Sequence, residues 1–247
     1  GADPIVGGQF TSNGLRSTLT DIGQPIGSFY GFQMDGIYQT DAEAEADGRT
    51  DARAGDIRFK DINNDGMLTD EDQDFLGSPI PDLTYGVNFN FFYKAFDATV
   101  LFDGVAGNLI LNGNIYRGYF DTEGNYLADA LNGWTPENPS STIPRNTLTD
   151  QAFTRRMSDF YLESGSYFRL RNLQIGYTLP SGTLGSALSK VRAYVNIQNL
   201  VTFTEYSGYY PEVGRNGRGG GGLFGAGVAE SAYPMPRTFM FGLQVGF

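Results

Sequence analysis

The residues best suited to chemistry in this 247-residue sequence form one short run rich in Asp and Asn. Residues 61–72 read Asp-Ile-Asn-Asn-Asp-Gly-Met-Leu-Thr-Asp-Glu-Asp. Side-chain oxygens at positions 1, 3, 5 and 12, a glycine at position 6 and a backbone carbonyl at position 7 are typical of a calcium loop, because this spacing gathers hard oxygen ligands around one point. The predicted ligands are Asp61, Asn63, Asp65, the Met67 carbonyl and Asp72.

The flanks of this loop differ from those of an EF-hand. Ile57 and Phe59 precede it with strand-like alternation, and only residues 70–76 could form a helical turn after it. Asp72 is also shorter than the usual Glu at position 12. The alternative is a surface turn rich in Asp and Asn that binds no metal. We expect bound calcium, as a structural ion that rigidifies an external loop.

Composition excludes several classes of function. The sequence contains no cysteine and no histidine, which excludes disulfides, thiol nucleophiles, Cys/His zinc sites and imidazole triads. A net charge of −11 argues against a nucleic-acid partner. No spacing singles out a hydrolytic pair of carboxylates, so we do not expect an enzyme. The chain opens without a signal peptide or a spanning helix, and we expect it to be a mature piece of something larger.

Alternation of apolar and polar residues at a period of two recurs along the chain and predicts strands. Residues 83–93 place Leu, Tyr, Val, Phe, Phe and Tyr at the odd positions. Four further stretches alternate in the same way: 96–103, 172–179, 191–198 and 238–247. Asp97 and Asp103 fall on the polar face of the second stretch. Arg169 and Arg171 stand at the start of the third strand, just before its alternating stretch, and are expected at a solvated rim.

The connections between these strands are alternately short and long. A turn near Lys94 is followed by connections at 104–167, 180–190 and 202–236. Such alternation is typical of a transmembrane β-barrel with short periplasmic turns and long external loops, although in a soluble sandwich the same apolar faces would form the core. Five strands are too few to close a membrane barrel, which needs about eight. We therefore predict an all-β, carboxyl-terminal portion of a barrel that is incomplete without its upstream part.

This interpretation divides the chain at residue 82. Residues 1–82 form an external loop region with the calcium-type loop, and residues 83–247 hold the barrel strands and their long external loops. Loops carry function more often than strands do, and aromatic rings stack on sugars and peptide side chains. The candidate substrate contacts in the long loops are Trp134, Tyr209 and Tyr210.

Several separate blocks resemble, in order, the carboxyl-terminal third of the SusC/RagA-like TonB-linked (TonB-dependent) outer-membrane transporters of Bacteroidetes. The blocks are GQPIGSFYG at 23–31, DGIY at 35–38, GDIRFKD at 55–61, GSPIPDLTYG at 77–86, WTPENP at 134–139, YFRLRNL at 167–173, QNL at 198–200 and YSG at 206–208. The resemblance implies a 22-stranded barrel around an amino-terminal plug. It also implies a SusD-like lipoprotein lid that captures oligosaccharides or oligopeptides, and energy from the TonB–ExbB–ExbD complex.

The last strand resembles a signal for assembly into the outer membrane. Apolar residues stand at every second position from Phe239 to the terminal Phe247. An ordinary final strand is the alternative. If the resemblance holds, deletion of Phe247 lowers outer-membrane assembly of the full protein.

The expected function is therefore one part of a nutrient importer in the bacterial outer membrane. Its expected partners are the upstream barrel and plug, the lipoprotein lid, TonB–ExbB–ExbD through the plug, and outer-membrane lipid. Without the plug and most of the barrel, this chain alone is not expected to transport. Two alternatives are a soluble secreted calcium-binding module that recognises glycans and a β-rich hydrolase that uses carboxylates.

Overall fold

A computed structural model describes residues 5–9, 16–49, 51–120, 125–139, 142–146, 155–180, 182–183, 188–213, 226–229 and 233–247. The chain divides into two compact units. The loop unit comprises residues 1–80, 109–163 and 212–232, and the sheet unit comprises residues 81–108, 164–211 and 233–247. The first boundary lies close to the division expected at residue 82, and two long connections group with the amino-terminal region.

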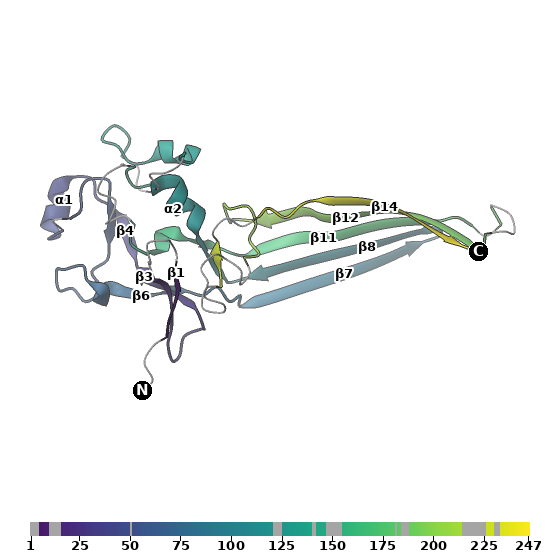
Figure 1. Ribbon diagram of the computed structural model, residues 1–247, viewed down its shortest axis with the longest axis horizontal. Coiled ribbons are helices and arrows are strands. Elements are labelled where there is room, and N and C mark those ends of the chain that lie inside the picture. The colour runs from purple at the N-terminus through teal and green to yellow at the C-terminus, as the bar shows by residue number, and fades with distance from the viewer. Residues whose placement is uncertain are drawn as a thin grey trace. The chain divides into compact units, whose positions relative to one another are not determined.

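The sheet unit is one antiparallel sheet of five long strands (Figure 1). In chain order they are β7 (Leu83–Tyr93), β8 (Phe96–Ala106), β11 (Tyr167–Thr178), β12 (Lys190–Thr204) and β14 (Thr238–Gly246). Their order across the sheet is β14-β12-β11-β8-β7. All five strands expected from the period-two pattern are confirmed. Lys94 has a φ of 53°, in the left-handed region that the tight turn between β7 and β8 requires.

The register places apolar side chains on one face across the whole sheet. One row of paired residues runs Phe91, Ala98, Ile175, Val195 and Phe241. Phe91 and Phe241 keep 57% and 83% of their surfaces exposed. This apolar face is therefore not buried in a protein core, which argues against the soluble sandwich.

A bulge interrupts β11 at Arg171. The pairing of β11 with β8 steps from Leu170↔Phe102 to Asn172↔Leu101, so Arg171 is an extra residue. The apolar positions therefore shift from even numbers before the bulge to odd numbers after it, yet stay on one face. This parity shift is visible in the sequence and could have predicted the bulge.

The loop unit is built from short elements. Its first sheet has the order β1-β2-β3-β6, from β1 (Ile5–Gln9), β2 (Arg16–Thr20), β3 (Ser28–Phe32) and β6 (Gln73–Gly77). Two smaller sheets pair β4 (Met34–Ile37) with β5 (Ile57–Phe59), and β9 (Leu109–Asn112) with β10 (Leu162–Ser164) and β13 (Val228–Ala229). The α-helices are α1 (Asp41–Ala46) and α2 (Gly113–Phe120), and 3-10 turns lie at 70–72, 128–132 and 159–161.

Two small apolar clusters hold the loop unit together. The first joins the three segments of the unit and contains Phe29, Leu111, Tyr116, Phe120, Met157, Tyr161 and Val228. The second surrounds α1 and β5 and contains Phe32, Tyr38, Ala44, Ala52, Ile57 and Phe59. The connections expected to be long loops therefore contribute to a packed structure of their own. In the part of the chain that the structure describes, no helix is long and apolar enough to cross a membrane.

Candidate functional site

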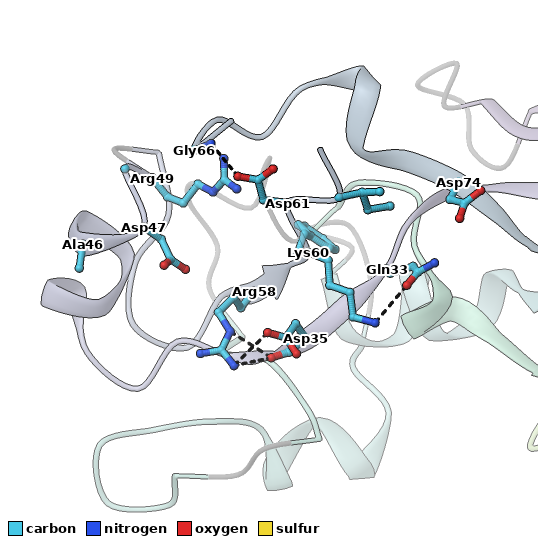
Figure 2. Close-up of a pocket in the computed structure, with 13 residues that line it drawn as sticks. Gln33, Asp35, Ala46, Asp47, Arg49, Arg58, Lys60, Asp61, Gly66 and Asp74 are labelled. Atoms are coloured by element: carbon cyan, nitrogen blue, oxygen red, sulfur yellow. Dashed lines mark hydrogen bonds and ion pairs between the residues drawn. The ribbon is translucent and has the colours of Figure 1, made fainter. Parts of the chain in front are cut away.

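The calcium-type loop connects β5 to β6 and is organised around Asp61. The two carboxylate oxygens of Asp61 accept hydrogen bonds from the backbone N–H groups of Asp65 at 3.3 Å and Gly66 at 2.7 Å. The Asn63 side chain also accepts from the Asp65 N–H at 3.0 Å. Gly66 has a φ of 80°, which permits the reversal at position 6. Figure 2 shows Asp61 directed toward Gly66.

Asp72 closes the loop from the other end. It is fully buried, and its carboxylate accepts from the N–H groups of Ile62 at 3.0 Å and Thr69 at 2.8 Å. Burial by itself raises the pKa of Asp72, but backbone donors led by Thr69 and the charge of Arg49 outweigh burial and hold that pKa below its ordinary value. The ionised carboxylate thus ties the two ends of the loop together.

The loop supplies the kinds of oxygen that calcium prefers, from three side chains on one turn. Asp61, Asn63 and Asp65 lie close to one another, whereas Asp72 is occupied by backbone N–H groups. Met67 is 60% exposed, and Leu68 packs against the second apolar cluster. Among the described residues, no group of three or more Asp or Glu carboxylates is arranged to hold a metal. Calcium binding therefore stays a prediction.

Arg169 and Asp103 form an ion pair on the polar face of the sheet. Arg169 donates to both carboxylate oxygens of Asp103, at 3.0 and 2.6 Å, and Arg171 donates to the same carboxylate at 3.0 Å. Arg169 is only 1% exposed, and its guanidinium lies 5.1 Å from the ring centre of Tyr167 and 5.6 Å from that of Tyr210. The expectation of a solvated rim is therefore wrong for Arg169, because aromatic rings cover its guanidinium.

A second ion pair crosses a strand on the same face. Arg192 on β12 donates to both oxygens of Asp97 on β8, at 2.9 and 2.5 Å. Its guanidinium passes over Gly176 on the intervening strand β11, where a Cβ atom would lie 2.4 Å from Arg192. The predicted placement of Asp97 and Asp103 on the polar face is confirmed, and Gly176 leaves the space that this contact needs.

The three aromatic residues expected to contact substrate have different environments. Trp134 is 9% exposed, and its indole N–H donates to the Gln39 side chain at 2.9 Å. Tyr210 accepts a hydrogen bond from Arg169, whereas Tyr209 is 73% exposed. Trp134 and Tyr210 therefore serve as packing contacts in this structure, and Tyr209 offers the most open ring of the three. Substrate contact by any of them stays a prediction.

Phe247 follows directly after β14, at the edge of the sheet. It is 94% exposed, and its backbone carbonyl accepts a hydrogen bond from the Ser189 hydroxyl at 3.4 Å. The alternating apolar residues of β14 lie on the apolar face, paired with those of β12. Its role as an assembly signal stays a prediction.

A sheet with one exposed apolar face and one ion-paired polar face is the arrangement of a membrane-barrel wall, in which lipid covers one face and the lumen the other. Comparison with known proteins places the chain in this class. No protein-family model matches it. The chain is 37% identical to TonB-dependent receptor P3 of Formosa agariphila over 91% of its length, and 32% identical to receptor P26 of the same organism over 95%. It is also 25% identical to the TonB-dependent receptor SusC of Bacteroides thetaiotaomicron over 76% of its length.

The fold matches a solved transporter as well. The RagAB peptide importer in its open-open state aligns with the whole chain at a TM-score of 0.72 and 22% identity. The chain belongs to the SusC/RagA-like TonB-dependent outer-membrane transporters. It spans 22% and 24% of the lengths of receptors P3 and P26, and 24% of the matched RagAB chain. Members of this family are outer-membrane transport proteins and not enzymes, as predicted.

Proposed function

We propose that the chain is one part of an outer-membrane importer that takes up oligosaccharides or oligopeptides. The observation that carries this proposal is the two-faced sheet. Its apolar face, represented by the exposed Phe91 and Phe241, suits lipid, and its polar face carries the Arg169–Asp103 and Arg192–Asp97 ion pairs. A polar lumen wall is what an importer of hydrophilic solutes requires.

The upstream barrel and plug, a SusD-like lipoprotein lid and the TonB–ExbB–ExbD complex are the proposed partners. Similarity to SusC and to the RagAB importer supports this set. In this account the lid holds the solute against the external loops, and the pull of TonB on the plug then opens a path along the polar face. Oligopeptides fit because the similar RagAB protein is described as a peptide importer. Oligosaccharides are the other solute class of this proposal.

Deletion of the gene tests this proposal. The source bacterium, its deletion strain and a complemented strain are grown on single oligosaccharides and on oligopeptides as sole nutrients, with monosaccharides and free amino acids as controls. We expect the deletion strain to lose growth on one oligomeric nutrient while it keeps growth on the monomers. Equal growth of deletion and parent strains on every oligomer would contradict import as the function.

We also propose that residues 61–72 bind calcium as a structural ion. The convergence of Asp61, Asn63 and Asp65 on one turn supports this assignment. Calorimetric titration of the calcium-stripped full-length transporter with CaCl₂ tests it, with Asp61→Asn as the site variant and Asp51→Asn as the matched control outside the loop. We expect Asp61→Asn to weaken binding at least ~10-fold. Identical titrations of both variants would place the calcium elsewhere.

A further inference from the structure

A shallow hollow of about 570 Å³ lies on the sheet unit, at the end of the sheet where the long connections begin. Its lining combines aromatic rings with hydroxyl groups and one carboxylate. It includes Tyr85, Phe168, Phe203, Ser164, Ser166 and Glu205. All of these residues belong to the sheet unit, so the hollow is a feature of that unit alone.

The three aromatic rings form a platform on the apolar face of the sheet. The register sets Tyr85, Gly104, Phe168 and Phe203 in one row across four strands. The ring centre of Phe168 lies 6.5 Å from that of Tyr85 and 6.4 Å from that of Phe203, and the ring planes differ by 20° and 21°. Gly104 makes room for this row, because a Cβ atom there would lie 2.5 Å from the Tyr85 hydroxyl, which donates to the Tyr167 carbonyl at 3.2 Å. The platform is therefore fixed by the sheet itself.

A second aromatic pair marks the other border of the apolar face. The ring centres of Phe96 and Tyr177 are 4.7 Å apart, next to the tight turn between β7 and β8. Phe96 precedes Gly104 by eight residues on β8, which is about 26 Å along the strand and about 20 Å of membrane depth at a tilt of about 40°. This depth is close to the apolar band of about 25 Å that aromatic residues border in outer-membrane barrels. The platform is therefore expected at the level of the lipid headgroups.

Polar groups adjoin the platform on the side of the long connections. Glu205 is exposed, and among the described residues its carboxylate makes no hydrogen bond or ion pair. The Ser166 hydroxyl oxygen accepts from the Gly107 N–H at 3.2 Å, and the Ser164 hydroxyl oxygen accepts from the Ser166 N–H at 3.3 Å. Since both oxygens already accept, both hydroxyl hydrogens remain available to an outside acceptor. The hollow thus offers two donors beside one anionic acceptor.

This combination selects a zwitterionic headgroup. The Glu205 carboxylate attracts an ammonium group and repels a phosphate, whereas the serine hydroxyls donate to phosphate oxygens. A headgroup with both a phosphate and a primary ammonium group satisfies both kinds of group. A purely anionic headgroup meets the carboxylate without compensation, and a quaternary ammonium group has no N–H to donate to it. Aromatic rings at the border of an apolar face suit the start of the acyl chains.

We propose that this hollow binds a phospholipid with a phosphoethanolamine headgroup, namely phosphatidylethanolamine. Its ammonium group donates to Glu205, its phosphate accepts from Ser164 and Ser166, and its acyl chains lie along the apolar face. The site is continuous with the face that lipid is expected to cover. It goes beyond the proposed import function, because it concerns the membrane side of the sheet and not the lumen.

The test uses the delipidated full-length transporter in detergent with magnesium present, so that anionic headgroups bridged by a divalent cation can compete. Native mass spectrometry measures the retention of phosphatidylethanolamine, phosphatidylcholine and phosphatidylglycerol with identical acyl chains, and of lipid A. We expect phosphatidylethanolamine to be retained about 10-fold more strongly than the other lipids. Glu205→Gln should remove this preference, whereas the matched control Glu45→Gln, at an exposed position on α1, should keep it.

A second pair of variants tests the aromatic platform. Phe203→Ala should weaken the retention of phosphatidylethanolamine about 3-fold or more, because it removes one ring of the platform. Phe91→Ala is the matched control, since Phe91 is 57% exposed on the same face but lies outside the hollow, and it should retain this lipid as the parent protein does. Heat-dependent gel migration verifies that each variant is folded.

Three results would overturn the inference. They are equal retention of phosphatidylethanolamine and phosphatidylcholine, stronger retention of phosphatidylglycerol or lipid A, and an unchanged headgroup preference in Glu205→Gln. Growth of the deletion strain tests import separately, because the headgroup preference is measured on the purified protein. A growth defect without the preference would refute this site alone, and the preference without a growth defect would refute import alone.

Discussion

The two units of this chain reach ordered structure by different means. In the sheet unit, five long strands repeat one pattern, and a single row of paired residues from Phe91 to Phe241 is apolar throughout. In the loop unit, short strands and helices surround two small apolar clusters. The order of the sheet follows from a period of two, because every residue faces either the apolar or the polar side. The order of the loop unit follows from a few contacts between distant residues.

Those contacts can be named. The Trp134 indole N–H reaches Gln39, 95 residues away, and Arg145 pairs with the buried Asp56 at 2.7 Å across 89 residues. Gly55 lies beneath both side chains, since a Cβ atom there would be 2.4 Å from the Trp134 ring and 2.6 Å from Arg145. The effect of a substitution in the sheet unit on stability should therefore depend on which face of the sheet carries it. The effect of a substitution in the loop unit should depend on the contact that it removes.

The largest effect is expected at Asp103. The Asp103→Asn change leaves the buried Arg169 guanidinium without its counter-charge and should lower the free energy of unfolding by about 3–5 kcal/mol. Asp97→Asn is the matched control, because the Arg192–Asp97 pair is more exposed, and its cost should be smaller. Urea unfolding of the transporter in lipid vesicles measures both. Equal losses would show that burial of Arg169 does not determine the cost.

The next largest effect is expected from a charge placed on the apolar face of β11, in comparison with the same charge on its polar face. Leu173 lies on the apolar face of β11 and Gln174 on the polar face. Leu173→Arg places a charge against lipid and should cost about 2–4 kcal/mol, whereas Gln174→Arg, at a lumen-facing site, should cost less than about 1 kcal/mol. Vesicle unfolding and heat-dependent gel migration report the difference. Similar values for the two variants would contradict the assignment of faces.

A smaller and local effect is expected at Trp134. Trp134→Phe keeps most of the ring packing but removes the hydrogen bond to Gln39, which contributes about 0.5–1.5 kcal/mol. Hydrogen exchange should rise in residues 125–139 and stay constant in β11 and β12. Faster exchange in those strands would show that the two units are energetically coupled.

The smallest effect concerns the pH dependence of the loop unit. Burial raises the pKa of Asp159 above its ordinary value of 3.8, although the Met34 N–H and Lys60 oppose this shift. A carboxyl group with a raised pKa in the folded state contributes full stability below pH 3.8 and loses it as the pH rises through the folded pKa. Asp159→Asn removes that loss, so the variant should gain stability relative to the parent protein as pH rises. A gain on acidification, measured by hydrogen exchange near β4, would contradict the sign.

The sheet unit has a local period and the loop unit depends on contacts between distant residues, and this difference explains which features could be predicted from the sequence. A period of two is local, so β7 was predicted at its observed bounds and Asp97 and Asp103 on their observed face. The bulge at Arg171 also left a local signal, in the parity shift of the apolar residues. Burial of Trp134 and Arg169 left none, because it depends on Gln39, Gly55 and Tyr210, which are distant in sequence. The short helices α1 and α2 were missed for a related reason, since they have too few turns to show a period.

We expect lipid to cover one face of the sheet and the lumen to adjoin the other. The segment contains no cysteine, so single cysteines at positions 172–175 and 193–197 can be labelled in intact outer membranes with a water-soluble maleimide. We expect labelling at positions 172, 174, 194 and 196, and protection at 173, 175, 193, 195 and 197. Labelling without a period of two, or labelling of the apolar positions from water, would contradict it.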